Sequence, residues 1–228
     1  MAQHLQKEIE KLKKKILSLG AVVEGSVQLS VKAIEERDSD LAEKVIRTDD
    51  DIDHAEVELE EDCLKILALH QPVAIDLRFI IAVLKINNDL ERIGDLAVNI
   101  AERVTFLKAR PGIRIPYDLQ GLSEKAILML RNSLDSLVNM DTILAGRVCA
   151  ADDGVDAINR QMYDLIKDAI RKNPGQLDVL IPYLSVSRYL ERIADHATNI
   201  AEDVIYMVEG IIARHRTEQF QPKSVDEQ

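Results

Sequence analysis

Apolar residues recur every three or four positions along most of this 228-residue chain. In the first stretch they include Leu5, Ile9, Leu12 and Ile16, which is the spacing of one buried helix face. The pattern predicts helices over residues 4–36, 39–69 and 72–107. The polar residues at 38–40 are suitable N-caps for the second helix, and Pro72 suits the first turn of the third.

The segment KARPGIRIPY at 108–117 lacks this spacing and contains two prolines and a glycine, so we interpret it as a linker. The helical pattern then restarts. It predicts helices over 119–140 and 142–172, a break at NPG (173–175), and a sixth helix that continues to about residue 215. Pro182 lies inside this sixth helix, where we expect a kink or a restart. Residues 217–228 read as a polar tail.

The two halves of the chain repeat each other. The string LERIGDLAVNIAE at 90–102 returns as LERIADHATNIAE at 190–202, with ten of thirteen positions identical. A second set of identities lies 103 residues apart and includes Asp38 with Asp141. Such self-similarity indicates two copies of one unit. We therefore predict an all-α protein of two tandem homologous three-helix bundles, residues 1–107 and 118–216, with six long helices packed up and down.

Composition and charge narrow the possible functions. The chain is 46% apolar with only 4% aromatic residues, a mix that favours helices. Its net charge of −11 disfavours nucleic acid as a partner, because phosphates would be repelled. We find no apolar run of the roughly 18 residues that a membrane span needs, and therefore expect a cytoplasmic protein without a transmembrane segment. Cys63 and Cys149 have no CxxC spacing and are expected to be buried thiols.

Acidic residues stand one helical turn apart in both copies. The third helix carries Glu91 and Asp95 on one face, and the second helix carries Asp49 and Asp53. The corresponding acids of the second copy are Asp152, Asp156, Glu191 and Asp195. Folding each helix pair about its turn brings the four acids of a copy to one level, with a mismatch of about 1.5 Å in the first half and about 3 Å in the second. The kink expected at Pro182 would change this second geometry.

Carboxylates gathered at one level repel each other, so each cluster needs a counter-charge. Two interpretations stay open at this point. One is a hard cation with oxygen ligands, such as Mg, Ca, Mn or iron, whereas the lack of imidazole argues against zinc or copper. The other is a set of surface salt bridges from Arg92, Arg103 and Arg192. Duplication of the whole arrangement favours the metal.

The polar residues beside these acids are weaker candidates for a role in the sites. His54 and His196 each follow a candidate ligand by one position, which turns the side chain about 100° away, so we expect them to pack or to be solvated. Asn99 and Asn199 are either hydrogen-bond donors to the carboxylates or ordinary surface amides.

The strings HQPVAIDLRFIIAVLKINNDLERIGDLAVNIAE and YLERIADHATNIAEDV resemble the two signature helices of the PhoU family of phosphate-uptake regulators. The resemblance covers nearly the whole chain. It implies a cytoplasmic protein of two three-helix bundles that acts without catalysis as a negative regulator of the phosphate-starvation response. It also implies an adaptor role between the ATPase of an ABC phosphate transporter and a sensor histidine kinase, with iron or another metal held on paired E(D)xxxD motifs.

In this sequence those motifs match Glu91 with Asp95 and Glu191 with Asp195, and they match Asp49 with Asp53 and Asp152 with Asp156. Two other classes of function remain. A carboxylate-bridged metal enzyme would typically use a Glu-x-x-His motif, and the His position is Gly94 in one copy and Ala194 in the other.

A structural helical scaffold is the third possibility. Apolar residues on the third helix, opposite its acids, form a second face that one bundle need not bury, and a homodimer or a partner protein could use it. This face comprises Phe79, Ile86, Ile93, Ile100 and Val104.

Overall fold

The computed structural model describes residues 2–110 and 118–211. Within these ranges every regular element is a helix, so the prediction of an all-α fold is confirmed. The helices are α1 (Ala2–Glu36), α2 (Ser39–His70), α3 (Ala74–Lys108), α4 (Leu119–Asn139), α5 (Thr142–Lys172), the short 3-10 helix η1 (Pro174–Gln176) and α6 (Leu177–Glu209).

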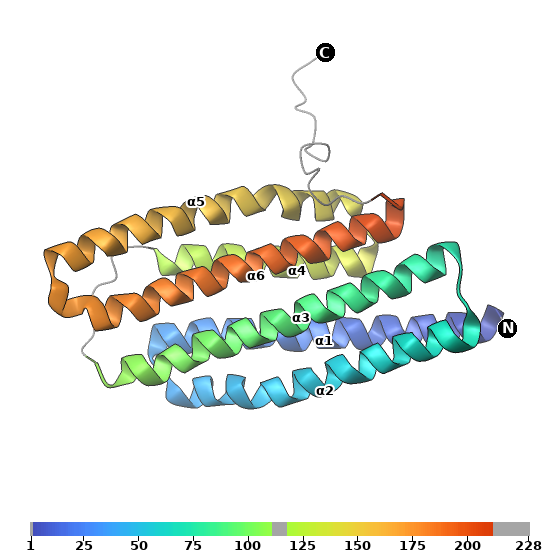
Figure 1. The fold of residues 1–228 in the computed structure, drawn as a ribbon, viewed down its shortest axis with the longest axis horizontal. Helices are drawn as coiled ribbons and strands as arrows, with labels where there is room; N and C mark the ends of the chain where they lie inside the picture. Colours follow the sequence, from blue (N-terminus) through green and yellow to red (C-terminus); the bar gives the residue numbers. More distant parts are fainter. Residues whose placement is uncertain (1, 111–117, 212–228) are drawn as a thin grey trace, which may run out of the picture.

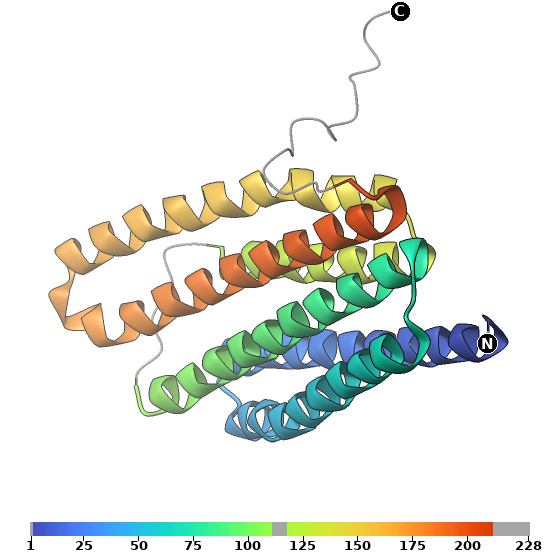
Figure 2. The same cartoon turned by 45° about the vertical axis from the view of Figure 1, so that its right-hand side comes forward.

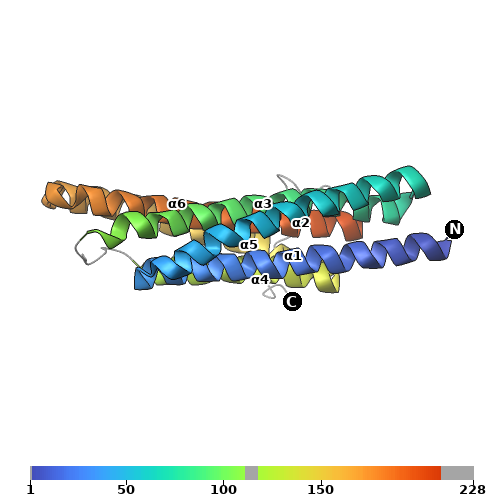
Figure 3. The ribbon, with the colours of Figure 1, turned by 90° about the horizontal axis from the view of Figure 1, so that it is seen from below.

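Helices α1–α3 form one up-and-down bundle and α4–α6 form another, as Figures 1 and 2 show. The two bundles lie side by side with α3 and α6 antiparallel at the centre, while α2 and α5 are the outer helices (Figure 1). Figure 3 shows α1 and α4 on the same side of this central pair, where they also touch each other. The predicted tandem arrangement of two three-helix bundles is therefore present. Most of the predicted linker and the whole polar tail lie outside the described residues.

The same local signals start the second helix of each bundle. Asp38 precedes α2, and its side chain accepts hydrogen bonds from the backbone N–H groups of Asp40 and Leu41. Asp141 precedes α5 and accepts from Ile143 and Leu144 in the same way. Both helices thus begin with a capping aspartate that satisfies free N–H groups. Because the caps correspond, the outer helices α2 and α5 start at equivalent positions and carry their acids to equivalent heights.

Three sequence expectations need correction. The sixth helix ends at Glu209 rather than near 215, because Gly210 adopts the left-handed conformation (φ 74°) that closes it. Pro182 causes no break or restart, since α6 is one helix from Leu177 to Glu209 and the proline lies within its second turn. Pro72 lies outside the third helix, which begins at Ala74 with Val73 as its N-cap.

Polar contacts join α3 to α6 across the centre of the molecule. Lys85 Nζ lies 2.9 Å from Asp203 Oδ1, and the Asp203 side chain is only 3% exposed. Asp89 Oδ1 lies 2.8 Å from His196 Nδ1 and accepts a hydrogen bond from Asn199 Nδ2 at 3.2 Å. These contacts pair charged or polar groups that the two helices would otherwise bury alone. They therefore set the register in which α3 and α6 pack.

The second apolar face of α3 is covered within the chain. All five of its residues, Phe79, Ile86, Ile93, Ile100 and Val104, are at most 7% exposed. The expectation that a homodimer or a partner would use this face is wrong, because α3 packs against α6 as well as against α1 and α2. The central helix has to be apolar on most sides because three helices surround it.

In the described part of the chain, one helix is long and apolar enough to cross a membrane by length and composition, namely the stretch His4–Glu36 of α1. Half of its apolar window is buried against the rest of the fold. Core helices of soluble proteins share this composition, so the helix is weak support for a membrane span.

Replacing Ile86 with Ala tests the burial of this face. We expect the free energy of unfolding to fall by about 2–5 kcal/mol, because the change leaves a cavity at a fully buried site. Val57→Ala, at a side chain that is 51% exposed, should change it by less than about 0.5 kcal/mol. Urea denaturation followed by circular dichroism measures both. A small effect at Ile86, together with a change of oligomeric state, would contradict the assignment.

Candidate metal centres

The four acids of the first copy lie where α2 crosses α3. Asp49 and Asp53 come from α2, and Glu91 and Asp95 come from α3. Burial and the charges of Asp53 and Asp95 raise the pKa of Asp49 to about 6. Burial and the charges of Asp95, Glu56 and Asp53 also raise the pKa of Glu91, against a lowering by Arg92. Acids of the two helices therefore raise one another's pKa values. They lie near each other, as predicted by counting residues along both helices from the turn between them.

Asp49 is partly enclosed in this first cluster, as is Glu91, whose Oε2 atom is also buried without a hydrogen bond from the described residues. The Oδ1 atom of Asp49 is buried and has no hydrogen-bond partner among the described residues. A methyl group on Gly94 would lie 3.6 Å from this oxygen and 3.2–3.3 Å from Ile52. The missing side chain at Gly94 thus lets α2 and its aspartate approach α3 closely. A buried carboxylate oxygen without a donor is costly, and a cation would compensate that cost.

The second cluster repeats the first on α5 and α6. Burial and the charges of Asp195 and Asp156 raise the pKa of Asp152 to about 6, with a partly opposing contribution from the Thr198 hydroxyl. The pKa of Glu191 is raised by burial and by Asp156, and that of Asp195 is raised by burial and by Glu191. All four predicted acids of this copy are therefore neighbours. α6 continues as one helix through Pro182, so no break separates its two acids from the start of the helix.

Arginines lie at the rim of both clusters. Arg92 is 3.5 Å from Glu91 and 3.6 Å from Asp95, and its side chain is 53% exposed. Arg160 is 3.3 Å from Asp156, a contact that the sequence analysis did not anticipate. Such exposed pairs contribute little. They do not reach the enclosed oxygen of Asp49, so salt bridges account for only part of the negative charge.

The acids are close enough to influence each other but do not form a finished coordination sphere. Within residues 2–110 and 118–211, no three acid, imidazole or thiol groups converge on one point at ligand distance. The donors nevertheless suit a hard cation, because they are carboxylates and three of them, Asp49, Glu91 and Asp152, have a buried oxygen without a hydrogen bond from the described residues. The carboxylate side chains would have to adopt other rotamers to close either site around an ion.

The residues beside the clusters take other roles. His54 is exposed and contacts the backbone oxygen of Asp50, and His196 contacts Asp89 at the α3–α6 interface, so both histidines pack or are solvated as predicted. Asn99 donates to the backbone oxygen of Asp95, and Asn199 donates to Asp89. Neither amide donates to a candidate ligand side chain.

Cys63 and Cys149 are buried free thiols, as expected. Burial raises the pKa of each to about 12. A protonated thiol is a poor metal ligand, so neither cysteine extends the clusters.

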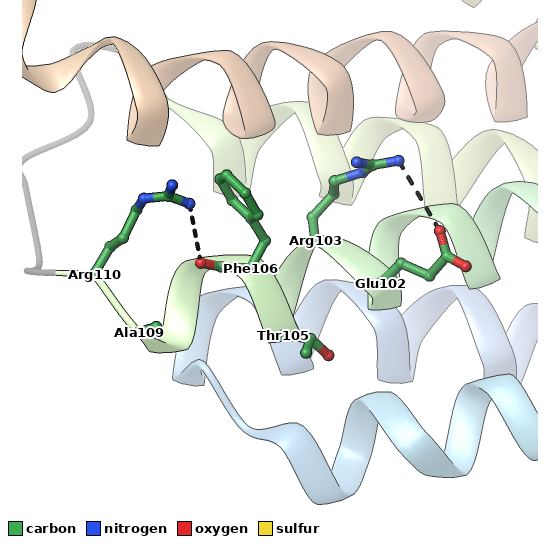
Figure 4. A pocket seen from close by; sticks show the side chains of 6 residues that line it. All are labelled: Glu102, Arg103, Thr105, Phe106, Ala109 and Arg110. Atoms are coloured by element: carbon green, nitrogen blue, oxygen red, sulfur yellow. Dashed lines mark hydrogen bonds and ion pairs between the residues drawn. The ribbon is translucent and has the colours of Figure 1, made fainter.

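A hollow of about 640 Å³ lies at the C-terminal end of α3, shown in Figure 4. Its side chains Arg103 and Phe106 of α3, and Arg110 just after α3, point toward α6. The Arg110 guanidinium lies 3.6 Å from the centre of the Phe106 ring and 3.5 Å from Asp178 of α6. Arg103 donates to the hydroxyl of Tyr189 at 3.4 Å. These cations hold the end of α3 against the start of α6 and are therefore part of the interface between the bundles.

Two interfacial contacts escaped sequence reasoning. The burial of Asp89 and the Lys85–Asp203 pair depend on which face of α3 meets α6. Asp89 and Asp203 stand near the acidic motifs in the sequence. The apolar pattern of one helix does not distinguish an acid at a helix interface from a solvated acid. The available signal was a departure from the repeat, since Asp89 corresponds to Tyr189 and Asp203 to Arg103.

The fold and the paired acidic clusters define a class of all-α proteins built from a duplicated three-helix unit. The family model of the PhoU domain matches residues 16–104 and again residues 119–204. The chain therefore belongs to the PhoU family, and the resemblance of its signature helices is confirmed. Members of this family are accessory or regulatory proteins, and the chain is not an enzyme.

Individual relatives and solved structures support the assignment to this family. The chain is 37% identical to a phosphate-specific transport system accessory protein PhoU homolog of Aquifex aeolicus, over 93% of this chain and 96% of the relative. It is 33% identical to the homolog of Clostridium acetobutylicum, over 90% and 94%. The crystal structure of PhoU from Pseudomonas aeruginosa has a TM-score of 0.88 and 35% identity, covering 90% of this chain and 99% of that one. For the phosphate transport system regulatory protein PhoU from Streptococcus pneumoniae, the TM-score is 0.81 at 28% identity, covering 91% and 98%.

The raised pKa values predict how the metal-free protein responds to pH. Asp49 and Asp152 have pKa values of about 6 in the fold against about 3.9 in an unfolded chain, so between these values the folded state binds more protons. Stability from these two groups is therefore greatest below pH 4 and falls as pH rises to about 6. Asp49→Asn and Asp152→Asn should raise Tm at pH 7.5 in EDTA and lose this advantage at pH 4.

Asp51→Asn is the matched control, because Asp51 is exposed on the same helix as Asp49. It should shift Tm by much less at pH 7.5. Equal Tm changes for Asp51→Asn and Asp49→Asn would mean that overall charge, rather than the clustered and desolvated carboxylates, sets the response. Thermal denaturation followed by circular dichroism provides the measurement.

Proposed function

We propose that the chain is an accessory protein of a phosphate transport system that acts as a metal-binding regulator. The relatives named above carry accessory and regulatory roles in phosphate transport, and the chain matches them over about nine tenths of its length. In this proposal it works in the cytoplasm as an adaptor between the ATPase of an ABC phosphate transporter and a sensor histidine kinase. It restrains the phosphate-starvation response.

The duplicated carboxylate clusters carry the metal-binding part of the proposal. Each copy gathers four acids from two helices, and the most enclosed aspartate of each has a pKa near 6. A structural ion pair would neutralise these groups and lower their pKa values, whereas burial and like charges raise them. The clusters therefore store repulsion that a bound cation would remove. Both halves keep this unfavourable arrangement, which a structural scaffold has no need to retain.

The ligand set would be Asp49, Asp53, Glu91 and Asp95 in one copy and Asp152, Asp156, Glu191 and Asp195 in the other. Iron is the metal that family resemblance favours, and Mn, Mg and Ca also prefer oxygen ligands. A bound ion would supply positive charge that links α2 to α3, or α5 to α6. The protein's own part is to hold the carboxylates in register and to keep Asp49 and Asp152 partly shielded from water.

Metal occupancy offers a physical basis for regulation. An ion that draws two helices together changes the surface that spans them, and a partner that prefers one of these surfaces would in turn change metal affinity. The four charges of a cluster become largely neutralised on metal binding, which alters the potential seen by any approaching protein. An adaptor that acts through surface contacts needs no catalytic group to use this signal.

A homodimer is also part of the proposal, and the fold restricts where it could form. Because the inner faces of α3 are covered, self-association would have to use apolar residues that remain exposed. Leu69, Val73 and Ile75 at the α2–α3 turn are 64–74% exposed and lie close together in the sequence. Burial of such a patch would favour association.

The test is metal binding by protein purified without chelator, measured by elemental analysis and by titration calorimetry with Mn²⁺. We expect up to one site per copy, and Asp95→Ala with Asp195→Ala should weaken affinity at least about tenfold while leaving the helical circular-dichroism signal in place. Binding should also weaken below pH 6, where Asp49 and Asp152 hold protons.

Asp51→Asn serves again as the control and should bind Mn²⁺ like the unaltered protein. The proposal fails if the double variant retains the metal content and affinity of the parent chain. It also fails if each single variant, Asp95→Ala or Asp195→Ala, removes all binding, since the two clusters are separate sites on opposite bundles.

A further inference from the structure

A groove with its own chemistry lies between α5 and α6, beside the second acidic cluster. It encloses about 570 Å³ and is lined by four residues from each helix. On α6 the lining follows the same face as Glu191 and Asp195, about one to three turns closer to the α5–α6 turn. The far end of this hairpin projects beyond α4, which has 21 residues against 31 in α5 (Figure 1). The groove is therefore accessible from outside.

Apolar side chains that the fold does not fully cover line part of the groove. Tyr163 is 56% exposed, Ile181 is 44% exposed, and Leu184 is half-buried. Large apolar groups that stay exposed beside a concavity favour burial against another molecule. Two antiparallel helices with such a furrow accept a third helix, whose ridges fit between theirs.

Two arginines border this apolar strip. Arg160 on α5 and Arg188 on α6 both line the groove and are exposed. Asp164 is the acid among the lining residues, so the two arginines give the lining itself a net positive charge, beside Asp156 and Glu191 of the second cluster. A positive lining is unusual for a chain of net charge −11. Most of the molecule repels an acidic partner, whereas Arg160 and Arg188 offer its carboxylates charge partners at this place.

The first half of the chain provides an internal comparison. At the repeat offsets of 103 and 100, Arg160 corresponds to Val57, Tyr163 to Glu60 and Arg188 to Asn88. The corresponding surface of α2 also carries Glu56 and Glu61. One duplicated surface has thus become acidic and the other basic and aromatic. Maintenance of the fold cannot account for this difference, because these positions point outward in both halves.

We propose that the α5–α6 groove binds an acidic amphipathic helix of a partner protein. The apolar side of the helix would cover Tyr163, Ile181 and Leu184, and its carboxylates would pair with Arg160 and Arg188. The proposal deepens the adaptor function and rests on it for the partner's role. It does not require a metal, so the two are tested separately.

Arg160 connects the groove to the acidic cluster. Its Nη1 atom lies 3.3 Å from Asp156, and the side chain is 69% exposed. An exposed pair of this kind exchanges partners at little cost. A carboxylate of the incoming helix therefore competes with Asp156 for Arg160. The charge of Arg188 also acts on Glu191, where it offsets part of the rise in pKa that burial and Asp156 cause. The docking surface and the second cluster share these two cations.

The experiment uses the full chain in EDTA and three fluorescein-labelled synthetic helices of about 18 residues, read by fluorescence polarisation. All three carry leucines spaced three and four apart, and the flanking positions hold glutamate, glutamine or lysine. We expect saturable binding of the glutamate helix, binding weaker by about tenfold for the glutamine helix, and still weaker binding for the lysine helix. Added salt should narrow these differences.

Variants locate the binding. Arg160→Gln and Arg188→Gln should each weaken the affinity for the glutamate helix by about five- to tenfold. The affinity for the glutamine helix should stay nearly unchanged. Ile181→Asp should abolish binding of both, and since Ile181 is exposed it should leave the fold intact. Arg47→Gln is the matched control, because Arg47 is an exposed arginine with an i,i+4 ion pair on the other bundle.

The proposal is overturned if glutamate and glutamine helices bind equally, if neither binds, or if Arg47→Gln weakens binding as much as Arg160→Gln. That last result would mean that the helix responds only to overall charge. Because the titrations contain EDTA, loss of metal binding by the acidic clusters would leave all these outcomes unaffected, so a failure of the metal proposal is distinguishable from a failure of this one.

Discussion

The antiparallel packing of α3 against α6 is the contact on which the rest of the structure depends. Each three-helix bundle alone would leave one side of its third helix apolar and open to water, and the pairing covers both sides at once. Buried polar groups set its register, through Lys85 with Asp203 and Asp89 with His196 and Asn199. Those partners must be matched, because an unpaired charge at this depth would cost more than the pair contributes.

This packing also determines where the acids end up. With α3 and α6 at the centre, α2 and α5 lie on opposite flanks, and each acidic cluster forms where a flanking helix crosses a central one (Figure 1). The protein therefore has two separated carboxylate clusters rather than one large site. Gly94 allows the closest approach in the first copy, where Asp49 is pressed against α3. The same crossing in the second copy carries Ala194, so a methyl group can be accommodated there.

Duplication gave two equivalent frames that have since diverged on their outer surfaces. The capping aspartates Asp38 and Asp141 and the acids of the clusters occur in both copies. The surroundings differ, since Arg92 of α3 acts on the first cluster, whereas Arg160 of α5 pairs with the second cluster in addition to Arg188 and Arg192 of α6. Two sites with the same ligands but different neighbouring charges would bind the same ion with different affinity and expose it to different partners.

The sequence by itself determined the helices, the duplication and the membership of each acidic cluster. These follow from local periodicity, from capping residues and from counting outward along antiparallel helices, which need no knowledge of how the bundles pack. Tertiary structure alone decided that the second apolar face of α3 is covered, that Pro182 is accommodated within α6, and that Asp89 and Asp203 are interfacial. A helix pattern reports which faces are apolar but not which neighbour covers them, because that choice depends on contacts between residues about a hundred positions apart.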